Sequence, residues 1–118
     1  MPVIDVEGKK IELTEDGFII NYDDWNEKVA CAIADREGVS KKCPLTQEKM
    51  EIIKFMREYY KKFEAFPVSL YICKHLHKPK ECTYEEFFDP LTAYKVAGLP
   101  KPVAYGELMD SITKFKTL

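Results

Sequence analysis

The stretch TQEKMEIIKFMREYYKKF, from Thr46 to Phe63, carries the strongest helical signal in the chain. Its apolar residues recur at intervals of three and four, which places them on one wide face of a helix: Ile52, Ile53, Met56, Tyr59, Tyr60 and Phe63. Thr46 is a suitable N-cap, because its hydroxyl can accept a hydrogen bond from a free backbone N–H of the first turn. The stretch predicts a long central helix whose apolar face packs on the core.

Shorter helices are predicted on both sides of this central helix. Before it, Asp23 or Asp24 can cap a helix in which apolar residues recur at helical spacing: Trp25, Val29, Ala32 and Ile33. Gly38 suits the end of that helix, because glycine readily adopts the left-handed conformation that often follows a helix.

Three more helices are predicted after the central one. The first has Pro67 in its first turn, where proline is well tolerated, and runs to about His77. The second begins at the capping-box pattern Thr83-Tyr84-Glu85-Glu86. The third runs from Pro90 through Ala97, and Gly98 closes it.

The N-terminus is predicted to form a β-hairpin. Val3–Val6 and Lys10–Leu13 resemble two short strands, with Gly8 in the turn between them. Alternate residues can share one buried face of this hairpin: Ile4, Val6, Ile11 and Leu13. A lone hairpin is only marginally stable, so it must dock on helices. We therefore expect a mainly α fold of the α+β type, in which a small N-terminal β-hairpin packs on a compact bundle of about five helices.

The composition is that of one soluble domain: 118 residues, 46% of them hydrophobic and 32% charged, with a net charge of −2. The slightly acidic balance does not favour nucleic-acid binding, because that affinity depends mostly on Lys and Arg. The chain shows no signal-peptide pattern and no apolar stretch long enough to span a membrane, so we expect a cytoplasmic protein. The four cysteines are then expected to be thiols, because the cytosol is reducing.

Several segments, taken in order, resemble the DsrC/TusE family of sulfur-relay proteins, which includes the gamma-subunit-like proteins of dissimilatory sulfite reductase. The resemblance covers nearly all of residues 1 to 105. Its most specific part is the tail motif AYKVAGLPKP, residues 93–102. The other matching segments are MPVIDVEGK (1–9), EDGF (15–18), DWNEKVA (24–30), LTQE (45–48) and IKFMREYY (53–60).

The resemblance implies a fold with an N-terminal hairpin beside a compact set of helices and a mobile C-terminal arm, here at about residues 98–105. It also implies a role. Typical members carry sulfur on a cysteine next to the C-terminus, some have a second cysteine upstream in the arm, and the arm inserts into siroheme sulfite reductase. The implied partners are therefore sulfur-relay proteins or siroheme sulfite reductase.

The tail departs from the family pattern at both cysteine positions. When the chain is aligned on Gly98-Leu99-Pro100-Lys101-Pro102, the upstream cysteine falls on Tyr94 and the terminal one on Tyr105. A phenol, with a pKa near 10, cannot accept sulfane sulfur as a thiolate does. The chain also continues past the family's usual end with an extra segment, residues 106–118. In that segment Leu108, Ile112 and Phe115 have the spacing of an amphipathic helix.

These departures predict a non-catalytic protein of sulfur metabolism with a regulatory or adaptor role and no enzyme activity of its own. The arm is rich in aromatics and prolines, which suit partner contact. The residues we expect to bind the partner are Tyr94, Lys95, Leu99, Lys101 and Tyr105. The family's arginine in the helix after the long one falls near Leu70, so the surface around the arm also differs.

The remaining cysteines leave a second hypothesis open. Cys82 lies between Lys78, Lys80 and the helix expected to start at Thr83, and both positive charge and a helix N-terminus lower a thiol pKa. Cys82, or else Cys73, could therefore carry sulfur in place of the lost positions. The pattern Cys73-x-His75-x-His77-x4-Cys82 is not a standard zinc spacing, so we expect no metal and no other cofactor.

A third hypothesis concerns the basic residues of the central helix. Lys54, Arg57 and Lys61 could contact phosphate, which would suit a small DNA-binding transcriptional regulator. A solvent-exposed helix face is the more ordinary explanation, and no helix-turn-helix signature is evident.

Overall fold

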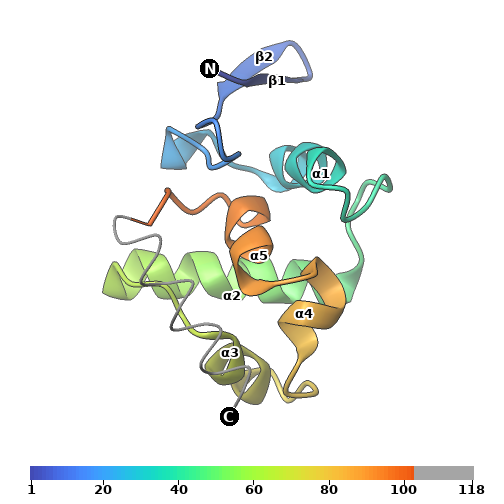
Figure 1. Ribbon diagram of the computed structural model, residues 1–118, viewed down its shortest axis with the longest axis vertical. Coiled ribbons are helices and arrows are strands. Elements are labelled where there is room, and N and C mark those ends of the chain that lie inside the picture. Colours follow the sequence, from blue (N-terminus) through green and yellow to red (C-terminus); the bar gives the residue numbers. More distant parts are fainter. Residues whose placement is uncertain (103–118) are drawn as a thin grey trace.

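A computed structural model describes residues 1–102 of the chain. In this part a two-stranded hairpin lies at one end of the molecule and α3 lies towards the other, with α5 in the middle (Figure 1). The predicted fold class, a small hairpin on a compact set of helices, is confirmed. The elements are β1 (Val3–Val6), β2 (Lys9–Glu12), the 3-10 helix η1 (Tyr22–Asp24), α1 (Glu27–Arg36), α2 (Gln47–Phe63), α3 (Ser69–His75), α4 (Cys82–Phe87) and α5 (Pro90–Val96).

The hairpin docks through the face that its alternating residues share. The strands are antiparallel, with Ile4 opposite Ile11, and Gly8 has a φ of +86° in the turn. Ile11 and Leu13 are buried, and the partly buried Ile4 packs against them. Because one face of a two-stranded sheet is covered by the helical core, the hairpin gains the burial that it needs to be stable.

The first α-helix starts later than the sequence suggested. Asp23 and Asp24 belong to η1, and Asn26 is the N-cap of α1, where its side chain accepts a hydrogen bond from the Val29 N–H at 2.9 Å. The reason is that Trp25, which lies between η1 and Asn26, has an extended backbone that separates η1 from α1. The predicted end is confirmed: α1 ends at Arg36, and Gly38 follows with a φ of +77°.

The central helix is present, and its apolar face is divided. Thr46 is the N-cap, as predicted, and accepts a hydrogen bond from the Lys49 N–H at 3.3 Å. Ile53 and Met56, in the middle of α2, are completely buried, whereas Phe63 at its end is 55% exposed. The expectation that the whole apolar stripe faces the core was therefore wrong for its C-terminal end, which extends beyond the packed core.

The last three helices differ from the prediction mainly in their starts. α3 begins at Ser69 rather than in the turn of Pro67. α4 begins at Cys82, so Thr83 lies within the helix, where its buried hydroxyl accepts a hydrogen bond from Ser69 Oγ at 2.7 Å. The predicted capping box therefore does not form. α5 starts at Pro90, as expected, with Asp89 as its N-cap.

In the described residues no helix combines the length and the apolar character that crossing a membrane requires.

Candidate functional site

The segment that leaves α5, residues 98–102, is called the arm root here. It packs against the fold: Leu99 is completely buried, and Pro102 is also buried. The arm predicted at 98–105 is therefore described only in its first part. Tyr105 and residues 106–118, for which we predicted partner contact and an amphipathic helix, lie outside the described residues.

Gly98 is the residue that lets the chain turn out of α5. Its φ is +70°, a conformation that residues with a Cβ rarely adopt. A Cβ at this position would also overlap Cδ1 of Trp25. The backbone thus passes directly against the indole ring, and this close approach requires glycine.

Two side chains, Trp25 and Arg57, hold the carbonyl end of α5, and we call this arrangement the carbonyl clamp. The indole N–H of Trp25 donates a hydrogen bond to the Val96 carbonyl at 2.9 Å. Nη1 of Arg57 donates to the carbonyls of Ala97 and Gly98 at 2.9 and 3.1 Å. The last carbonyls of a helix have no partner within the helix, and a cation is favourable there. The clamp therefore fixes the direction in which the arm root leaves the fold.

The Arg57 guanidinium is itself enclosed by aromatic rings. Its central carbon lies 4.0 Å from the ring centroid of Tyr22 and 4.3 Å from that of Trp25, and Nη2 donates to the Tyr22 carbonyl at 3.3 Å. Burial lowers the pKa of the Arg57 guanidinium, and the neighbouring Tyr22 and Asp23 raise it. Arginine remains charged, because its reference pKa is far above neutral. The positive charge of Arg57 is therefore directed at carbonyls of the fold and not at solvent.

Two lysines tie the end of α5 and the arm root to neighbouring segments. Lys95 pairs with Glu37 at 3.4 Å, next to the end of α1, and both side chains are 15% exposed. Lys101 pairs with Asp16, between β2 and η1. The hydrogen bond from Lys101 lowers the pKa of the Asp16 carboxyl. Both predicted arm lysines are therefore engaged within the chain.

Tyr94 and Leu99 belong to the core. Tyr94 is completely buried, its hydroxyl donates to the Pro67 carbonyl at 2.6 Å, and its ring lies 5.3 Å from that of Phe66. Burial raises the pKa of the Tyr94 phenol. The expectation that Tyr94 and Leu99 contact a partner was therefore wrong for this conformation, because α5 directs Tyr94 inwards and the arm root packs Leu99 against the core.

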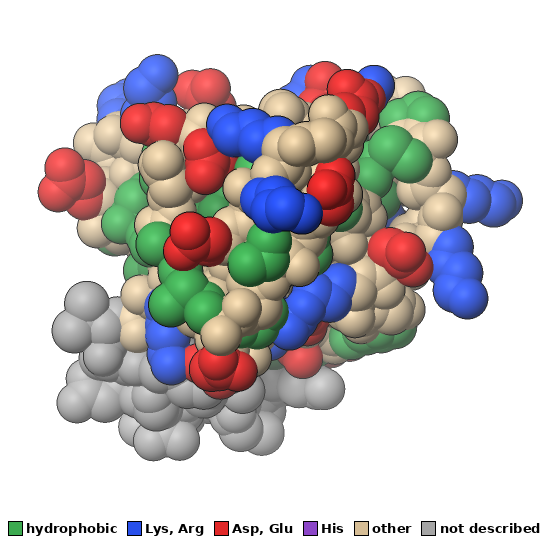
Figure 2. All heavy atoms as spheres, turned by 90° about the horizontal axis from the view of Figure 1, so that it is seen from above, with side chains coloured by type: hydrophobic (Ala, Val, Ile, Leu, Met, Phe, Trp, Pro, Cys, Tyr) green, Lys and Arg blue, Asp and Glu red, His purple; other side chains and the backbone are tan. Residues whose placement is uncertain are grey.

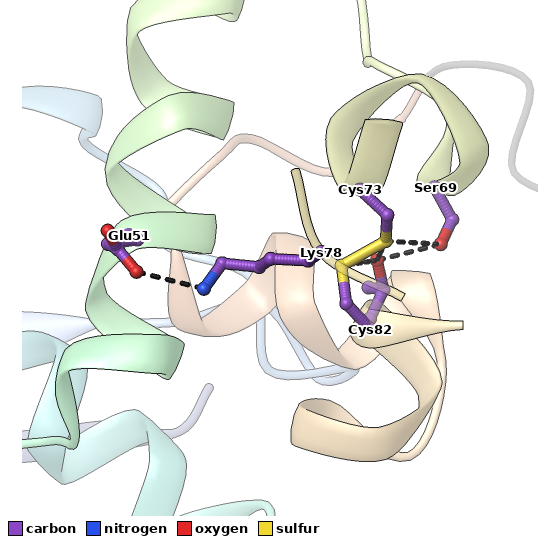
Figure 3. The surroundings of a disulfide bond; sticks show 6 residues. Glu51, Ser69, Cys73, Lys78 and Cys82 are labelled. Atoms are coloured by element: carbon purple, nitrogen blue, oxygen red, sulfur yellow. Dashed lines mark hydrogen bonds and ion pairs between the residues drawn. A yellow bond between two sulfur atoms is a disulfide. The ribbon is translucent and has the colours of Figure 1, made fainter. Parts of the chain in front are cut away.

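The four cysteines form two disulfides, Cys31–Cys43 and Cys73–Cys82, so the expectation of free thiols was wrong. Figure 3 shows the second bond, which joins α3 to α4. The fold brings the Cα atoms of Cys73 and Cys82 to 5.8 Å, a normal separation for a disulfide. An argument from the reducing cytosol could not reveal that the fold pairs these residues.

The Cys73–Cys82 bond lies in a small polar environment within the core. Ser69 and Thr83 place their hydroxyls 4.0 and 3.6 Å from the sulfur of Cys73, and the two cysteines are 0% and 3% exposed. Cys82 is therefore not the accessible thiol that we had considered. Both sulfurs of the pattern considered for a metal are bonded to each other, and the nearby His75 ring lies 4.8 Å from the ring of Phe55.

The three basic residues of α2 that we considered for phosphate contact have different surroundings. Arg57 points into the carbonyl clamp, Lys54 pairs with Glu27 at 3.4 Å, and Lys61 lines a groove beside the helix. On the face seen in Figure 2, basic and acidic side chains are interspersed. Arg57 is therefore engaged inside the fold, whereas a phosphate contact through Lys54 and Lys61 stays a prediction.

Sequence reasoning missed one feature, an open groove of about 630 Å³ between α2 and α3. We call it the aromatic groove. Tyr59 and Phe63 had been assigned to the core. The aromatic spacing of four residues in both helices was visible in the sequence, but it does not distinguish a buried face from an exposed one. The groove is lined by Phe55, Tyr59, Phe63, Tyr71 and His75, with Glu58, Lys61 and Lys62 beside them.

Comparison with known families gives a match over almost the whole described chain. The family model described as "DsrC like protein" matches residues 5–104. This range includes most of the hairpin, all the helices of the described part and the arm root.

Individual relatives agree with this match. The chain is 34% identical over 104 residues to the sulfite reductase, dissimilatory-type subunit gamma, of Nitratidesulfovibrio vulgaris, covering 86% of this chain and 96% of the relative. It is 33% identical over 106 residues to the sulfurtransferase TusE of Photorhabdus laumondii, covering 82% and 92%. Among solved structures, the oxidized gamma-subunit of the dissimilatory sulfite reductase (DsrC) from Archaeoglobus fulgidus matches with a TM-score of 0.76 and 34% identity, covering 87% of this chain and 98% of that one.

Proposed function

This chain belongs to the DsrC family, and we propose that it acts there as a partner-binding protein that does not itself carry sulfur. The partner we propose is a sulfur-relay protein or a siroheme sulfite reductase. The role is regulatory or that of an adaptor, because a family member without a working thiol can occupy a docking site and deliver nothing to it.

The observation that carries this proposal is the state of the sulfur atoms. All four cysteines of the chain lie in the described part, and all are in disulfides. Sulfane sulfur is accepted by a thiolate, and a disulfide sulfur already has a covalent partner. At the upstream cysteine position of the family the chain has Tyr94, a buried phenol whose pKa is raised. A phenol of this kind supplies no substitute nucleophile.

The carbonyl clamp supports the partner-binding part of the proposal. The clamp and the Lys101–Asp16 pair hold the arm root at fixed points of the fold. An arm that leaves a rigid base loses less conformational freedom on binding than one that leaves a loose base. The arm root is thus held in place although Tyr94 and Tyr105 replace the family's cysteines.

Sulfur loading tests the absence of a carrier function. The chain is incubated with a persulfide donor and its intact mass is measured before and after reduction. We expect no reducible gain of sulfur in the wild-type chain. The TusE of Photorhabdus laumondii, treated alongside, is the positive control, and the Tyr105→Cys variant of this chain is the matched control, in which a gain of sulfur is expected at the new cysteine.

The binding part requires a second experiment. The full chain is mixed with a purified siroheme sulfite reductase or with sulfur-relay proteins, and complex formation is measured by size-exclusion chromatography and calorimetry. A stoichiometric complex supports the proposal. Failure to bind any of these proteins, in conditions where a cysteine-tailed relative binds, contradicts it.

The carrier hypothesis for Cys82 or Cys73 has a clear requirement. The disulfide between them must first be reduced, and their side chains, which are almost completely buried, must become accessible. A gain of sulfur confined to the Cys82 or Cys73 peptide of the reduced chain would support a carrier. The regulator hypothesis is weakened by the inward position of Arg57.

A further inference from the structure

The aromatic groove is lined by two rows of rings. Phe55, Tyr59 and Phe63 follow one another at intervals of four residues on α2, and Tyr71 and His75 do the same on α3. The rings contact one another: the centroid separations are 4.7 Å for Tyr59–Phe63, 4.8 Å for Phe55–His75 and 5.7 Å for Tyr59–Tyr71. The rows therefore form one continuous aromatic surface.

This surface is open to solvent at its outer side. Phe63 is 55% exposed and Tyr71 is 47% exposed, although both are large and apolar. Clustered exposed apolar side chains on a small protein indicate an interaction site more often than scattered ones do. Aromatic residues of this kind are also the typical anchors of protein interfaces.

The shape of the surface favours a helix as its occupant. Two neighbouring helices, each with large side chains one turn apart, form a channel into which the apolar face of a third helix can pack. The row from Phe55 to Phe63 covers nine residues of α2, and the eight steps between them give a length of about 12 Å. A partner helix of roughly three turns would cover it.

The charges at the rim define the partner further. Lys61 and Lys62 line the groove, and Glu58 is the carboxylate that lines it with them. This edge is therefore positive, on a chain whose net charge is −2. Opposite charge across an interface selects partners and accelerates their association. Acidic residues beside the apolar face of the incoming helix would meet these lysines.

We propose that the aromatic groove is a docking site for an acidic amphipathic helix of a partner protein. The inference rests on the proposed function, because it assigns the partner-binding role to a second surface besides the arm. It specifies a partner segment with large apolar side chains at intervals of three and four and with Glu or Asp beside them. The rings meet at interplanar angles of 40°, 49° and 63°, so they do not present parallel flat faces on which successive nucleobases could stack, and this favours a helix over a single-stranded nucleic acid.

The test uses a fluorescent synthetic peptide of about 14 residues, with leucines at helical intervals and glutamates on the flanks. A second peptide has lysine in place of every glutamate. Binding to the full-length oxidised chain is measured by fluorescence anisotropy. We expect the acidic peptide to bind and the basic peptide to bind at least about tenfold more weakly.

Three variants locate the site. Phe63→Ala should weaken binding of the acidic peptide about tenfold, because it removes an exposed anchor ring. The double variant Lys61→Glu/Lys62→Glu should reverse the preference towards the basic peptide. Phe88→Ala is the matched control, because Phe88 is 60% exposed and does not line the groove, and its binding should be unchanged. Circular dichroism of each variant verifies that it is folded.

Several outcomes would overturn the inference. These are no binding, equal binding of both peptides, or binding that Phe63→Ala leaves unchanged. Other occupants would also overturn it: a single-stranded oligouridine that displaces the acidic peptide, a dimer of the chain that Phe63→Ala dissociates, or peptide binding that appears only in the full-length Leu108→Glu/Ile112→Glu variant. If one of these outcomes is found but the chain still binds a sulfite reductase or a relay protein, only the groove proposal is contradicted. If the chain binds no sulfite reductase and no relay protein, the proposed function is contradicted as well.

Discussion

The two sides of α2 both carry aromatic rings and basic side chains, but these have different roles on the two sides. On one side Arg57 lies between the rings of Tyr22 and Trp25 and donates to the carbonyls that end α5. On the other side the aromatic groove has lysines beside Tyr59 and Phe63. The first side is closed by its own chain, and the second is open.

Both sides have rings and cations, so the feature that distinguishes them is the presence of hydrogen-bond acceptors. The side that offers acceptors to its cation is part of the packed fold. A cation can be taken out of water when hydrogen bonds replace its hydration, and the end of α5 supplies unpaired carbonyls for Arg57. Lys61 and Lys62 lie in the last turn of α2, but within the described chain neither donates a hydrogen bond to a carbonyl, and both stay exposed.

Gly98→Ala should have the largest effect, because it forces a Cβ into Trp25 on the closed side. We expect the free energy of unfolding to fall by about 3–5 kcal/mol, measured by urea denaturation. Gly38→Ala is the control: its φ is similar, but no atom lies within 4 Å of the added Cβ. The control should lose only about 1–2 kcal/mol, from backbone strain. Equal losses in the two variants would argue against the close approach to Trp25.

Arg57→Ala should cost about 2–4 kcal/mol of stability, because carbonyls at the end of α5 lose their partner. Arg57→Lys should recover only part of this, since lysine cannot donate in two directions from a planar group. Lys54→Ala, on the same helix, is the control and should cost less than about 0.5 kcal/mol. If Arg57→Ala were as mild as Lys54→Ala, the clamp would not stabilise the fold.

Removing the disulfide between α3 and α4 tests whether it holds α3 in place as one side of the aromatic groove. The Cys73→Ala/Cys82→Ala variant should lose about 2–3 kcal/mol, because the unfolded chain is no longer constrained. Hydrogen exchange should speed up more at the amides of α3 than at those of α5, because this bond joins α3 to α4 and does not involve α5. Unchanged exchange in α3 would mean that packing alone holds the groove wall.

Phe63→Ala should change the free energy of unfolding by no more than about 0.5 kcal/mol, because the ring is already largely exposed. Phe87→Ala, at a completely buried ring, is the contrasting variant and should cost about 3–5 kcal/mol. Thermal denaturation measures both. A large loss in Phe63→Ala would show that the groove belongs to the core.

The Asp16–Lys101 pair should produce a small dependence of stability on pH. The pKa of Asp16 is lower in the folded chain than in the unfolded one, so the pair stabilises the fold above the unfolded pKa, and the contribution is lost as pH falls through the folded value. Lys101→Gln should therefore raise the pKa of Asp16, measured by NMR titration. An unchanged Asp16 titration would mean that the pair does not persist in solution.

The sequence predicted what depends on local pattern. The hairpin, the Thr46 cap, the α5 start at Pro90 and the glycine at its end all follow from residues that lie close together along the chain. The family resemblance, through the tail motif, was also readable and is confirmed by the family match.

What could not be predicted depends on residues far apart in sequence. Arg57 looked like a surface cation, because nothing near it in the sequence shows that the carbonyls of Ala97 and Gly98 will reach it. The cysteine pairs and the burial of Tyr94 depend in the same way on where the helices pack. The aromatic groove was missed because periodicity gives the face of a helix but not what covers that face.

The carbonyl clamp also sets a condition on folding. Its hydrogen bond from Trp25 to Val96 joins residues that are 71 positions apart, so it can form only once that long loop has closed. During synthesis Trp25 leaves the ribosome long before its acceptor does. Since Trp25 is the single tryptophan of the chain, its intrinsic emission is a probe of this closure that needs no added label.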